Sequence, residues 1–196
     1  MTTRRPSVVV LAGPNGAGKS TVAPLVLRGA LDVVEFVNAD DIARGLSPFN
    51  IEGAAVAAGR IMLARIRDLA RQRVSFAFET TLASRTFAPW LKTLKQDGYA
   101  FHLVFLWLPS ADAAAARVAH RVRLGGHSIP DDTIRRRYHG GVRNFFGLYR
   151  ELSTTWIMYD SSHPAPRLIA EGEHGRPPGV RDPWLWSTIV GASDAK

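Results

Sequence analysis

The residues of this chain best suited to chemistry lie near its N-terminus, where glycine, lysine and hydroxyl side chains follow the spacing G-x-x-x-x-G-K-[ST]. They are Gly13, Pro14, Asn15, Gly16, Ala17, Gly18, Lys19, Ser20 and Thr21. Glycines let the backbone curl so that consecutive N–H groups point into one concavity, which suits a polyphosphate. Lys19 is expected to reach the outer phosphates, and the Ser20 hydroxyl is expected to ligate Mg²⁺. The spacing predicts a phosphate loop for ATP or GTP.

Two carboxylates and an arginine follow the next apolar segment: Asp40, Asp41 and Arg44. Phosphoryl transfer to a hydroxyl needs a carboxylate that accepts the hydroxyl proton and orients the oxygen. Asp40 is the preferred candidate for this base, and Asp41 is its competitor. Either aspartate could instead cap the following helix. We therefore expect Asp41 and Arg44 beside the substrate and keep both aspartates as candidates.

A third apolar segment ends in Glu79, Thr80 and Thr81. Glu79 is expected to hold Mg²⁺ through water or to bind a substrate hydroxyl. The two threonines are expected to position the substrate or its phosphate. Capping of the helix that begins near Thr86 is the alternative. The substrate role is favoured, because ligands of open α/β sheets bind beyond the carboxyl ends of the strands.

Arg117 and Arg121 are four residues apart, so they share one face of a helix. Like charges on one face repel each other unless an anion lies between them. This pattern favours a lid that stabilises the charge on a transferred phosphoryl group, with a flexible exit at Gly125-Gly126. A solvated basic helix is the alternative. His127 is the one histidine expected near the phosphates.

The elements that must position these residues alternate between strand-like and helix-like segments, which is typical of an α/β domain with a mainly parallel sheet. The expected strands are Val8–Ala12, Val33–Asn38, Val74–Phe78, Ala100–Leu108, Trp156–Asp160 and Arg167–Ala170. The expected helices are Thr21–Arg28, Asn50–Gln72, Thr86–Gln96, Ala111–Leu124 and one from Asp131 or Asp132 to about Leu152, interrupted by Gly140-Gly141. The pattern predicts a three-layer fold, with a central sheet flanked by helices.

Glycine and proline accumulate over residues 171–183, so the sheet is expected to end near Ala170. We therefore expect one domain over residues 1–170 and a Gly/Pro-rich C-terminal tail over residues 171–196. Trp184 and Trp186 lie in this tail. They predict that the tail docks onto the rest of the chain or onto a partner.

The composition, 46% hydrophobic and 21% charged over 196 residues, is that of one globular domain. We expect no membrane span and no signal peptide, because no apolar run is long enough. The absence of cysteine excludes thiolate catalysis and agrees with a cytoplasmic protein. The net charge of +8 favours an acidic partner. A phosphate-rich small substrate is preferred, and nucleic acid is the less favoured reading.

Four motifs in order resemble the zeta toxin family: Gly13 to Thr21, Asn38-Ala39-Asp40, Phe78 to Leu82, and Gly125 to Pro130. The resemblance covers about residues 7–170. It implies a P-loop kinase fold and transfer of the ATP γ-phosphate to a sugar hydroxyl of UDP-N-acetylglucosamine. A separate antitoxin protein would then be a candidate partner.

Carried over by motif, the resemblance makes Asp40 the base, and Lys19 and Ser20 the holders of phosphate and Mg²⁺. Glu79 and Thr81 would form the substrate wall, and Arg121 or Arg117 would belong to the lid. The chain departs from the toxins at Asn38, where they have a carboxylate, and at His127, where they have an arginine. An alignment on Arg44 would select Asp41 as the base.

The sequence as a whole predicts an ATP- and Mg²⁺-dependent kinase for a hydroxyl of a small substrate, such as a sugar nucleotide. A kinase for nucleic-acid ends or another nucleotide is the alternative. An ATPase coupled to movement is least favoured. The signature Leu-Ser-Gly-Gly-Gln and a strand ending in Asp-Glu are both absent from the sequence.

Overall fold

The computed structural model of this protein describes residues 5–30 and 33–194. Within these residues the strands are β1 (Ser7–Ala12), β2 (Glu35–Val37), β3 (Phe76–Thr80), β4 (Ala100–Trp107), β5 (Thr155–Asp160), β6 (Arg167–Glu173) and β7 (Gly179–Val180). The helices are α1 (Lys19–Pro24), η1 (Leu25–Ala30), α2 (Ala39–Leu46), α3 (Ile51–Arg71), α4 (Phe87–Gln96), α5 (Ala111–Arg123), α6 (Asp131–Asn144), η2 (Phe145–Tyr149), α7 (Arg150–Leu152) and α8 (Pro183–Asp194). The segments η1 and η2 are π-helical turns.

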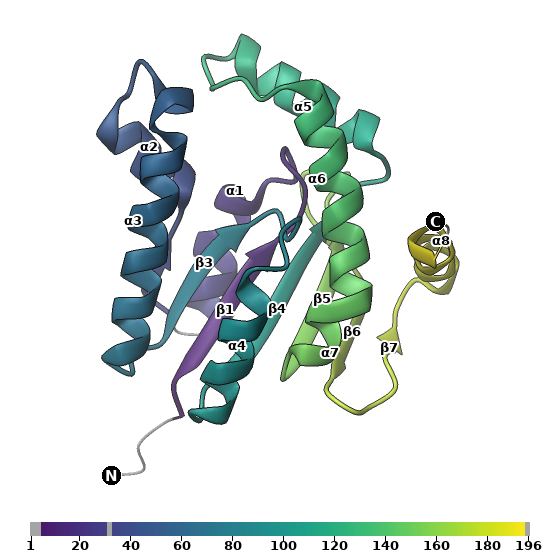
Figure 1. The fold of residues 1–196 in the computed structure, drawn as a ribbon. Coiled ribbons are helices and arrows are strands. Elements are labelled where there is room, and N and C mark those ends of the chain that lie inside the picture. Colours follow the sequence, from purple (N-terminus) through teal and green to yellow (C-terminus); the bar gives the residue numbers. More distant parts are fainter. Residues whose placement is uncertain (1–4, 31–32, 195–196) are drawn as a thin grey trace.

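The described strands form one seven-stranded sheet in the order β2-β3-β1-β4-β5-β6-β7. The first five strands in the chain pair in parallel, and β6 and β7 continue the sheet antiparallel. Parallel strands need crossover helices, and these place helices on both faces of the sheet. The mostly parallel, three-layer α/β fold that the sequence predicts is confirmed (Figure 1).

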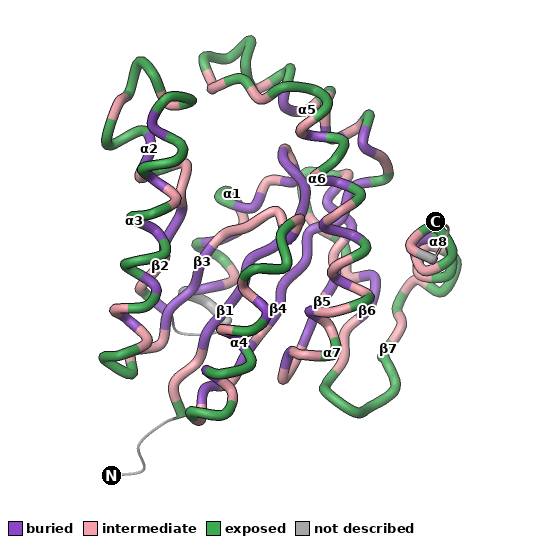
Figure 2. Tube along the Cα trace, in the orientation of Figure 1, coloured by how far each residue is buried: buried purple, intermediate pink, exposed green. Residues whose placement is uncertain are grey.

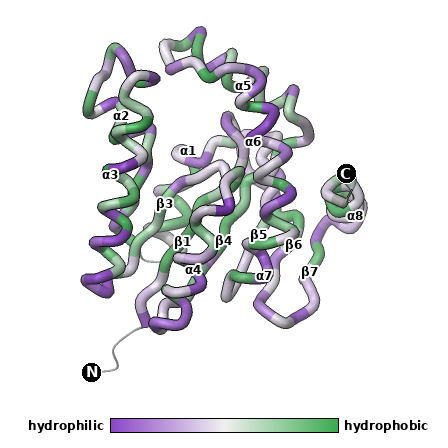
Figure 3. The backbone as a smooth tube through the Cα atoms, viewed as in Figure 1, coloured by the Kyte–Doolittle hydropathy of each residue, from purple (hydrophilic) through white to green (hydrophobic). Residues whose placement is uncertain are grey.

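Side chains alternate between the two faces along each strand. Val8 and Val10 of β1 point into the larger core, which α3, α4, α5, α6, η2 and α8 cover. Val9 and Leu11 point into a smaller core beneath α1 and η1. The central strands are therefore buried on both sides (Figure 2), and they read as continuous apolar segments (Figure 3).

The expected strand Val33–Asn38 is shorter in the structure, where β2 covers Glu35–Val37 and Asn38 starts a helix. The Asn38 side-chain oxygen accepts a hydrogen bond of 2.8 Å from the Asp40 backbone N–H, and Asn38 is the N-cap of α2. Asn38 supplies the cap that the sequence had left to Asp40 or Asp41. Both carboxylates lie in the first turn of α2 instead, where the helix dipole favours negative charge.

The expected interruption at Gly140-Gly141 is wrong, since α6 runs through both glycines. The two glycines allow α6 to approach the loop after β3 closely. A Cβ at position 141 would lie 2.4 Å from the backbone oxygen of Thr81, and one at position 140 would lie 3.4 Å from Ala83. The helix thus packs directly on the loop that follows β3. Asn144 fixes the same loop by donating to the backbone oxygens of Leu82, at 2.9 Å, and Ala83, at 3.0 Å.

The sheet does not end near Ala170, because β6 continues to Glu173 and β7 pairs with it. The segment after β7 forms α8, which packs back on the body of the protein. The Trp186 ring stacks on Trp156 of β5, with ring centres 5.6 Å apart and planes at 11°. Trp184 is exposed. A separate tail over residues 171–196 stays a prediction.

Over residues 5–30 and 33–194, no helix is both long enough and apolar enough to cross a lipid bilayer.

Candidate functional site

The phosphate loop lies between the carboxyl end of β1 and the start of α1, at the edge of the sheet where β3 also ends. Its lysine is buried and folds back over the loop. The Lys19 ammonium donates to the backbone oxygens of Gly13 and Pro14, both at 2.9 Å. Gly16 has a φ of +80°, and a Cβ there would lie 2.9 Å from the Cβ of Arg117. The loop is therefore wedged between the sheet and α5.

Glu79, at the end of β3, joins the phosphate loop to the start of α2. Its Oε2 accepts from the Ser20 hydroxyl at 2.8 Å and from the Asn38 amide at 3.0 Å. Its Oε1 lies 3.6 Å from the Lys19 ammonium. Burial lowers the pKa of Lys19 below its usual 10.5, and the Glu79 and Asp40 carboxylates oppose that shift. The Glu79 carboxylate, at the end of β3, thus contacts residues from the segments that follow β1 and β2.

The Ser20 hydroxyl and the Glu79 carboxylate fit the Mg²⁺ that a phosphate loop implies. They are oxygen donors within 2.8 Å of each other, and Mg²⁺ prefers oxygen ligands and takes few of them from protein. Ser20 would ligate the ion, with Glu79 acting through water, and the phosphates would supply further ligands. The described residues contain no group of three or more histidine or carboxylate side chains that could hold a metal alone.

Asp40 and Asp41 are adjacent in sequence but differ in their surroundings. Asp41 forms an exposed ion pair with Arg44, at 2.9 Å. Asp40 instead faces His127, whose Nε2 lies 3.9 Å from the Asp40 Oδ2. The side chain of Asp40 is 49% exposed and that of His127 is 15% exposed. Asp40 is therefore the aspartate that contacts the segment beyond α5.

The two arginines of α5 approach the phosphate loop in different ways. Arg117 donates to the backbone oxygens of Gly16, at 3.5 Å, and Ser162, at 2.8 Å. Arg121 donates to the His127 oxygen at 3.4 Å. Its Nε is buried and has no hydrogen-bond partner in the described part of the chain. Buried donors are normally paired, so this one is suited to a ligand.

These residues enclose a cavity of about 320 Å³, which we call the phosphate-loop cavity. The predicted phosphate loop supplies six of its lining residues, and the end of the second predicted strand supplies Asp40, Asp41 and Arg44. The predicted lid supplies Arg117 and Arg121, and Glu79 joins them. The lining residues are Asn15, Gly16, Gly18, Lys19, Ser20, Thr21, Asn38, Asp40, Asp41, Arg44, Glu79, Arg117, Arg121, Gly126 and His127.

Thr80 and Thr81 do not line this cavity. The Thr80 hydroxyl accepts from the Leu82 backbone N–H at 3.1 Å, and the Thr81 backbone oxygen faces Gly141. Both residues shape the loop between β3 and α4. Thr81 lies beside α6, while Glu79 alone of this motif reaches the cavity.

A second cavity of about 240 Å³ adjoins the first, and both are lined by Asp40 and His127. The remaining walls of the second cavity come from α2, from α3, from the segment that leads into α6, and from α6 itself. They are Ala39, Ala43, Ile51, Glu52, Ala55, Ser128, Ile129, Pro130, Thr133 and Arg137. The Asp40 carboxylate therefore stands where the two cavities meet.

The loop after β5 also belongs to this site, and the sequence reasoning missed it. The Ser161 hydroxyl donates to the Ala17 backbone oxygen at 2.7 Å, and the Ser162 oxygen accepts from Arg117. Ser162 is held in turn by the Asp160 carboxylate. The signal was a run of polar residues after a buried strand, the same signal that pointed to Asp40 and Glu79.

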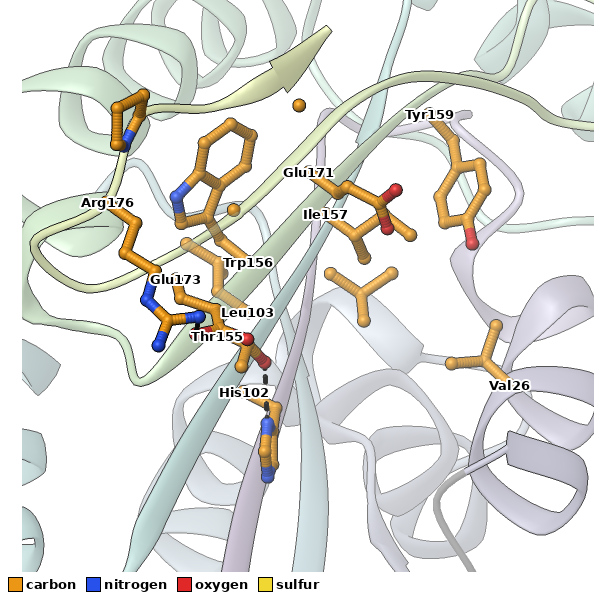
Figure 4. Close-up of a pocket in the computed structure, with 14 residues that line it drawn as sticks. Val26, His102, Leu103, Thr155, Trp156, Ile157, Tyr159, Glu171, Glu173 and Arg176 are labelled. Atoms are coloured by element: carbon orange, nitrogen blue, oxygen red, sulfur yellow. Dashed lines mark hydrogen bonds and ion pairs between the residues drawn. The ribbon is translucent and has the colours of Figure 1, made fainter. Parts of the chain in front are cut away.

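A larger cavity of about 460 Å³ lies over β4, β5 and β6, and it shares no residue with the phosphate-loop cavity. Figure 4 shows His102, Ile157, Tyr159 and Glu171 around it, with Val26 of η1 at its side. Its carboxylates Glu171 and Glu173 are paired with arginines. The cavity opens on the sheet face that α1 and η1 cover elsewhere.

Comparison with known sequences gives two findings. Residues 8–139 match the family described as AAA domain. An uncharacterized protein of Haemophilus influenzae is 31% identical over 130 residues, which are 66% of this chain and 91% of that protein.

Solved structures share the fold at low identity. The AvrRxo1-ORF1:AvrRxo1-ORF2 complex with sulphate ions has a TM-score of 0.70 at 14% identity, and covers 95% of this chain. This chain spans 64% of the length of that protein. The PezAT chromosomal toxin-antitoxin system of Streptococcus pneumoniae has a TM-score of 0.64 at 13% identity, with coverages of 100% and 90%. A gluconokinase from Sinorhizobium meliloti 1021 has a TM-score of 0.51 at 22% identity, with coverages of 82% and 85%.

At these identities the solved structures show a shared P-loop kinase fold. The family match extends from β1 through the phosphate loop and α5 into α6, which is more than half of the sequence. The chain belongs to the AAA domain family.

Proposed function

We propose that this protein transfers the γ-phosphate of ATP, or of GTP, to a hydroxyl group of a small acceptor molecule. The observation that carries the proposal is the position of Asp40 between two cavities. A phosphate-loop cavity alone would suit any nucleotide hydrolase. A second cavity that meets it at a carboxylate gives room for an acceptor.

The residues divide the reaction between them. Lys19 and Arg121 would bind the phosphates and stabilise the charge on the transferred group. Asp40 would accept the proton of the acceptor hydroxyl and orient its oxygen. Arg117 holds α5 against the phosphate loop through its bonds to backbone oxygens. Bound Mg²⁺ would neutralise charge on the phosphate oxygens.

The first acceptor to test is a sugar nucleotide, UDP-N-acetylglucosamine. The resemblance of the four motifs to zeta toxins supports this choice, and so does the likeness in fold to a toxin-antitoxin system. On the same grounds we propose that a separate antitoxin protein is a partner. The net charge of +8 keeps a 5′-hydroxyl oligonucleotide as the second acceptor to test.

The test is transfer of labelled γ-phosphate from ATP to each acceptor, with Mg²⁺ present. The Asp40→Asn variant is expected to lose about 10²- to 10⁴-fold in transfer rate, the range of general base catalysis, with ATP affinity retained. Asp41→Asn decides between the two carboxylates. If Asp41→Asn loses the transfer and Asp40→Asn keeps it, the base is Asp41. ATP hydrolysis without transfer to any acceptor would refute the kinase proposal.

A further inference from the structure

Arg137 is a charged residue of the second cavity that forms no ion pair within the described part of the chain. It is partly buried, and no hydrogen bond or ion pair joins it to any described residue. The contrast with Arg135, on the same helix, is clear. Arg135 is paired with Asp112 at 2.6 Å and with Asp131 at 2.5 Å, and both pairs are exposed.

A partly buried guanidinium without a partner has lost part of its hydration, and no hydrogen bond or ion pair compensates for that cost. Guanidinium groups in such places are commonly matched to a carboxylate or phosphate, which they bind through two parallel hydrogen bonds. Thr133 lies one helical turn before Arg137, and both line the cavity from α6. Its hydroxyl adds a donor on the same wall.

The carboxylates that line the cavity do not pair with Arg137. Glu52 lines the cavity from α3, and it forms no ion pair with Arg137. Asp40 and His127 stand at the junction with the phosphate-loop cavity. Ile51 and Ile129 form apolar walls between the charged ends. An acceptor in this cavity would thus contact the Asp40 carboxylate at the junction with the phosphate-loop cavity and the unpaired Arg137 guanidinium on the α6 wall.

We propose that Arg137 binds an anionic group of the acceptor and so selects acidic acceptors over neutral ones. This inference rests on the proposed function, since it concerns the molecule whose hydroxyl faces Asp40. The anionic group is a carboxylate or a phosphate, as in a sugar acid or a sugar nucleotide. At about 30 Å³ per water, the cavity has room for about eight waters, which matches a single sugar unit.

The experiment measures direct binding by calorimetry, which needs no turnover. Wild type, Arg137→Gln and Arg136→Gln are each titrated with gluconate, UDP-N-acetylglucosamine and neutral N-acetylglucosamine, after loading with Mg²⁺ and a non-hydrolysable ATP analogue. Arg136 is the matched control, since it is adjacent, exposed, and lines neither cavity. The thermal midpoint of each variant checks that it folds.

At least one of the two anions is expected to bind wild type and Arg136→Gln with similar affinity, and Arg137→Gln at least about tenfold more weakly. The two anions separate a carboxylate from a phosphate acceptor. Equal affinity for Arg137→Gln and wild type would overturn the inference, as would neutral sugar binding as tightly as the anions, or no binding of either anion. Because all three proteins keep the same phosphate loop, binding there alone gives equal affinities. Anion binding at Arg137 without any phosphoryl transfer would refute only the proposed function.

Discussion

Replacing Gly141 by alanine tests the contact that joins α6 to the loop between β3 and α4. The added Cβ would lie 2.4 Å from the Thr81 backbone oxygen, far inside van der Waals distance. Neither atom can move away by a side-chain rotation, because the backbone fixes the position of the Cβ and the oxygen belongs to the backbone. The helix and the loop must therefore separate, and Asn144 would lose its hold on the loop as they do.

The size of the effect follows from two opposing terms. Alanine is favoured over glycine in a helix by about 1 kcal/mol. Overpacking of a filled site costs about 1–3 kcal/mol, and a clash of a Cβ with a backbone oxygen belongs at the upper end. The free energy of unfolding should fall by about 2 kcal/mol, which corresponds to a loss of about 4–8 °C in Tm for a chain of this size.

Urea unfolding followed by tryptophan fluorescence measures the change, and Gly147→Ala is the matched control. Gly147 is also helical, but it is exposed, and a Cβ there would meet nothing within 4 Å. That variant should gain up to about 1 kcal/mol from helix propensity. Equal shifts in the two variants would show that close packing of α6 on the loop is not the reason for Gly141.

Two further predictions concern stability. Burial raises the pKa values of Tyr138 and Tyr149 to about 12, above their usual value of 10.0, so their stabilising contribution is full below pH 10 and is lost as pH rises through about 12. Between pH 9 and 12, the free energy of unfolding should fall less in the variant with both tyrosines replaced by phenylalanine than in wild type. An equal fall in the two proteins would contradict this prediction. Trp186→Ala removes the ring stacked on Trp156 and should lower the free energy of unfolding by about 3 kcal/mol in the same urea assay. An unchanged midpoint would mean that α8 is held by other contacts.

Much of the fold and the phosphate loop could be predicted from the sequence because their signals are local. Glycine spacing before a helix identifies the loop at Lys19, and buried strands that end in polar residues identify Asp40 and Glu79. The same local reasoning placed Arg117 and Arg121 on one helical face. Their common cavity follows from the parallel arrangement of the strands.

The remainder depends on contacts between segments far apart in the sequence. Gly140-Gly141 reads locally as a helix break, yet its cause is the approach of residues about sixty positions earlier. Similarly, Ser162 gains its role only because α5 brings Arg117 to it. Arg137 looks like one member of a basic run, and only the cavity separates it from its neighbours. Local patterns carry no information about such distant partners.

The partial exposure of the Asp40 side chain bears on how the protein uses its nucleotide. A carboxylate that is 49% exposed can orient a water molecule as well as an alcohol. Under the proposed function, water and the acceptor would therefore compete for the same γ-phosphate, and ATP hydrolysis would be the side reaction. The yield of phosphorylated product per ATP consumed would then depend on how completely the proposed acceptor excludes water from the second cavity.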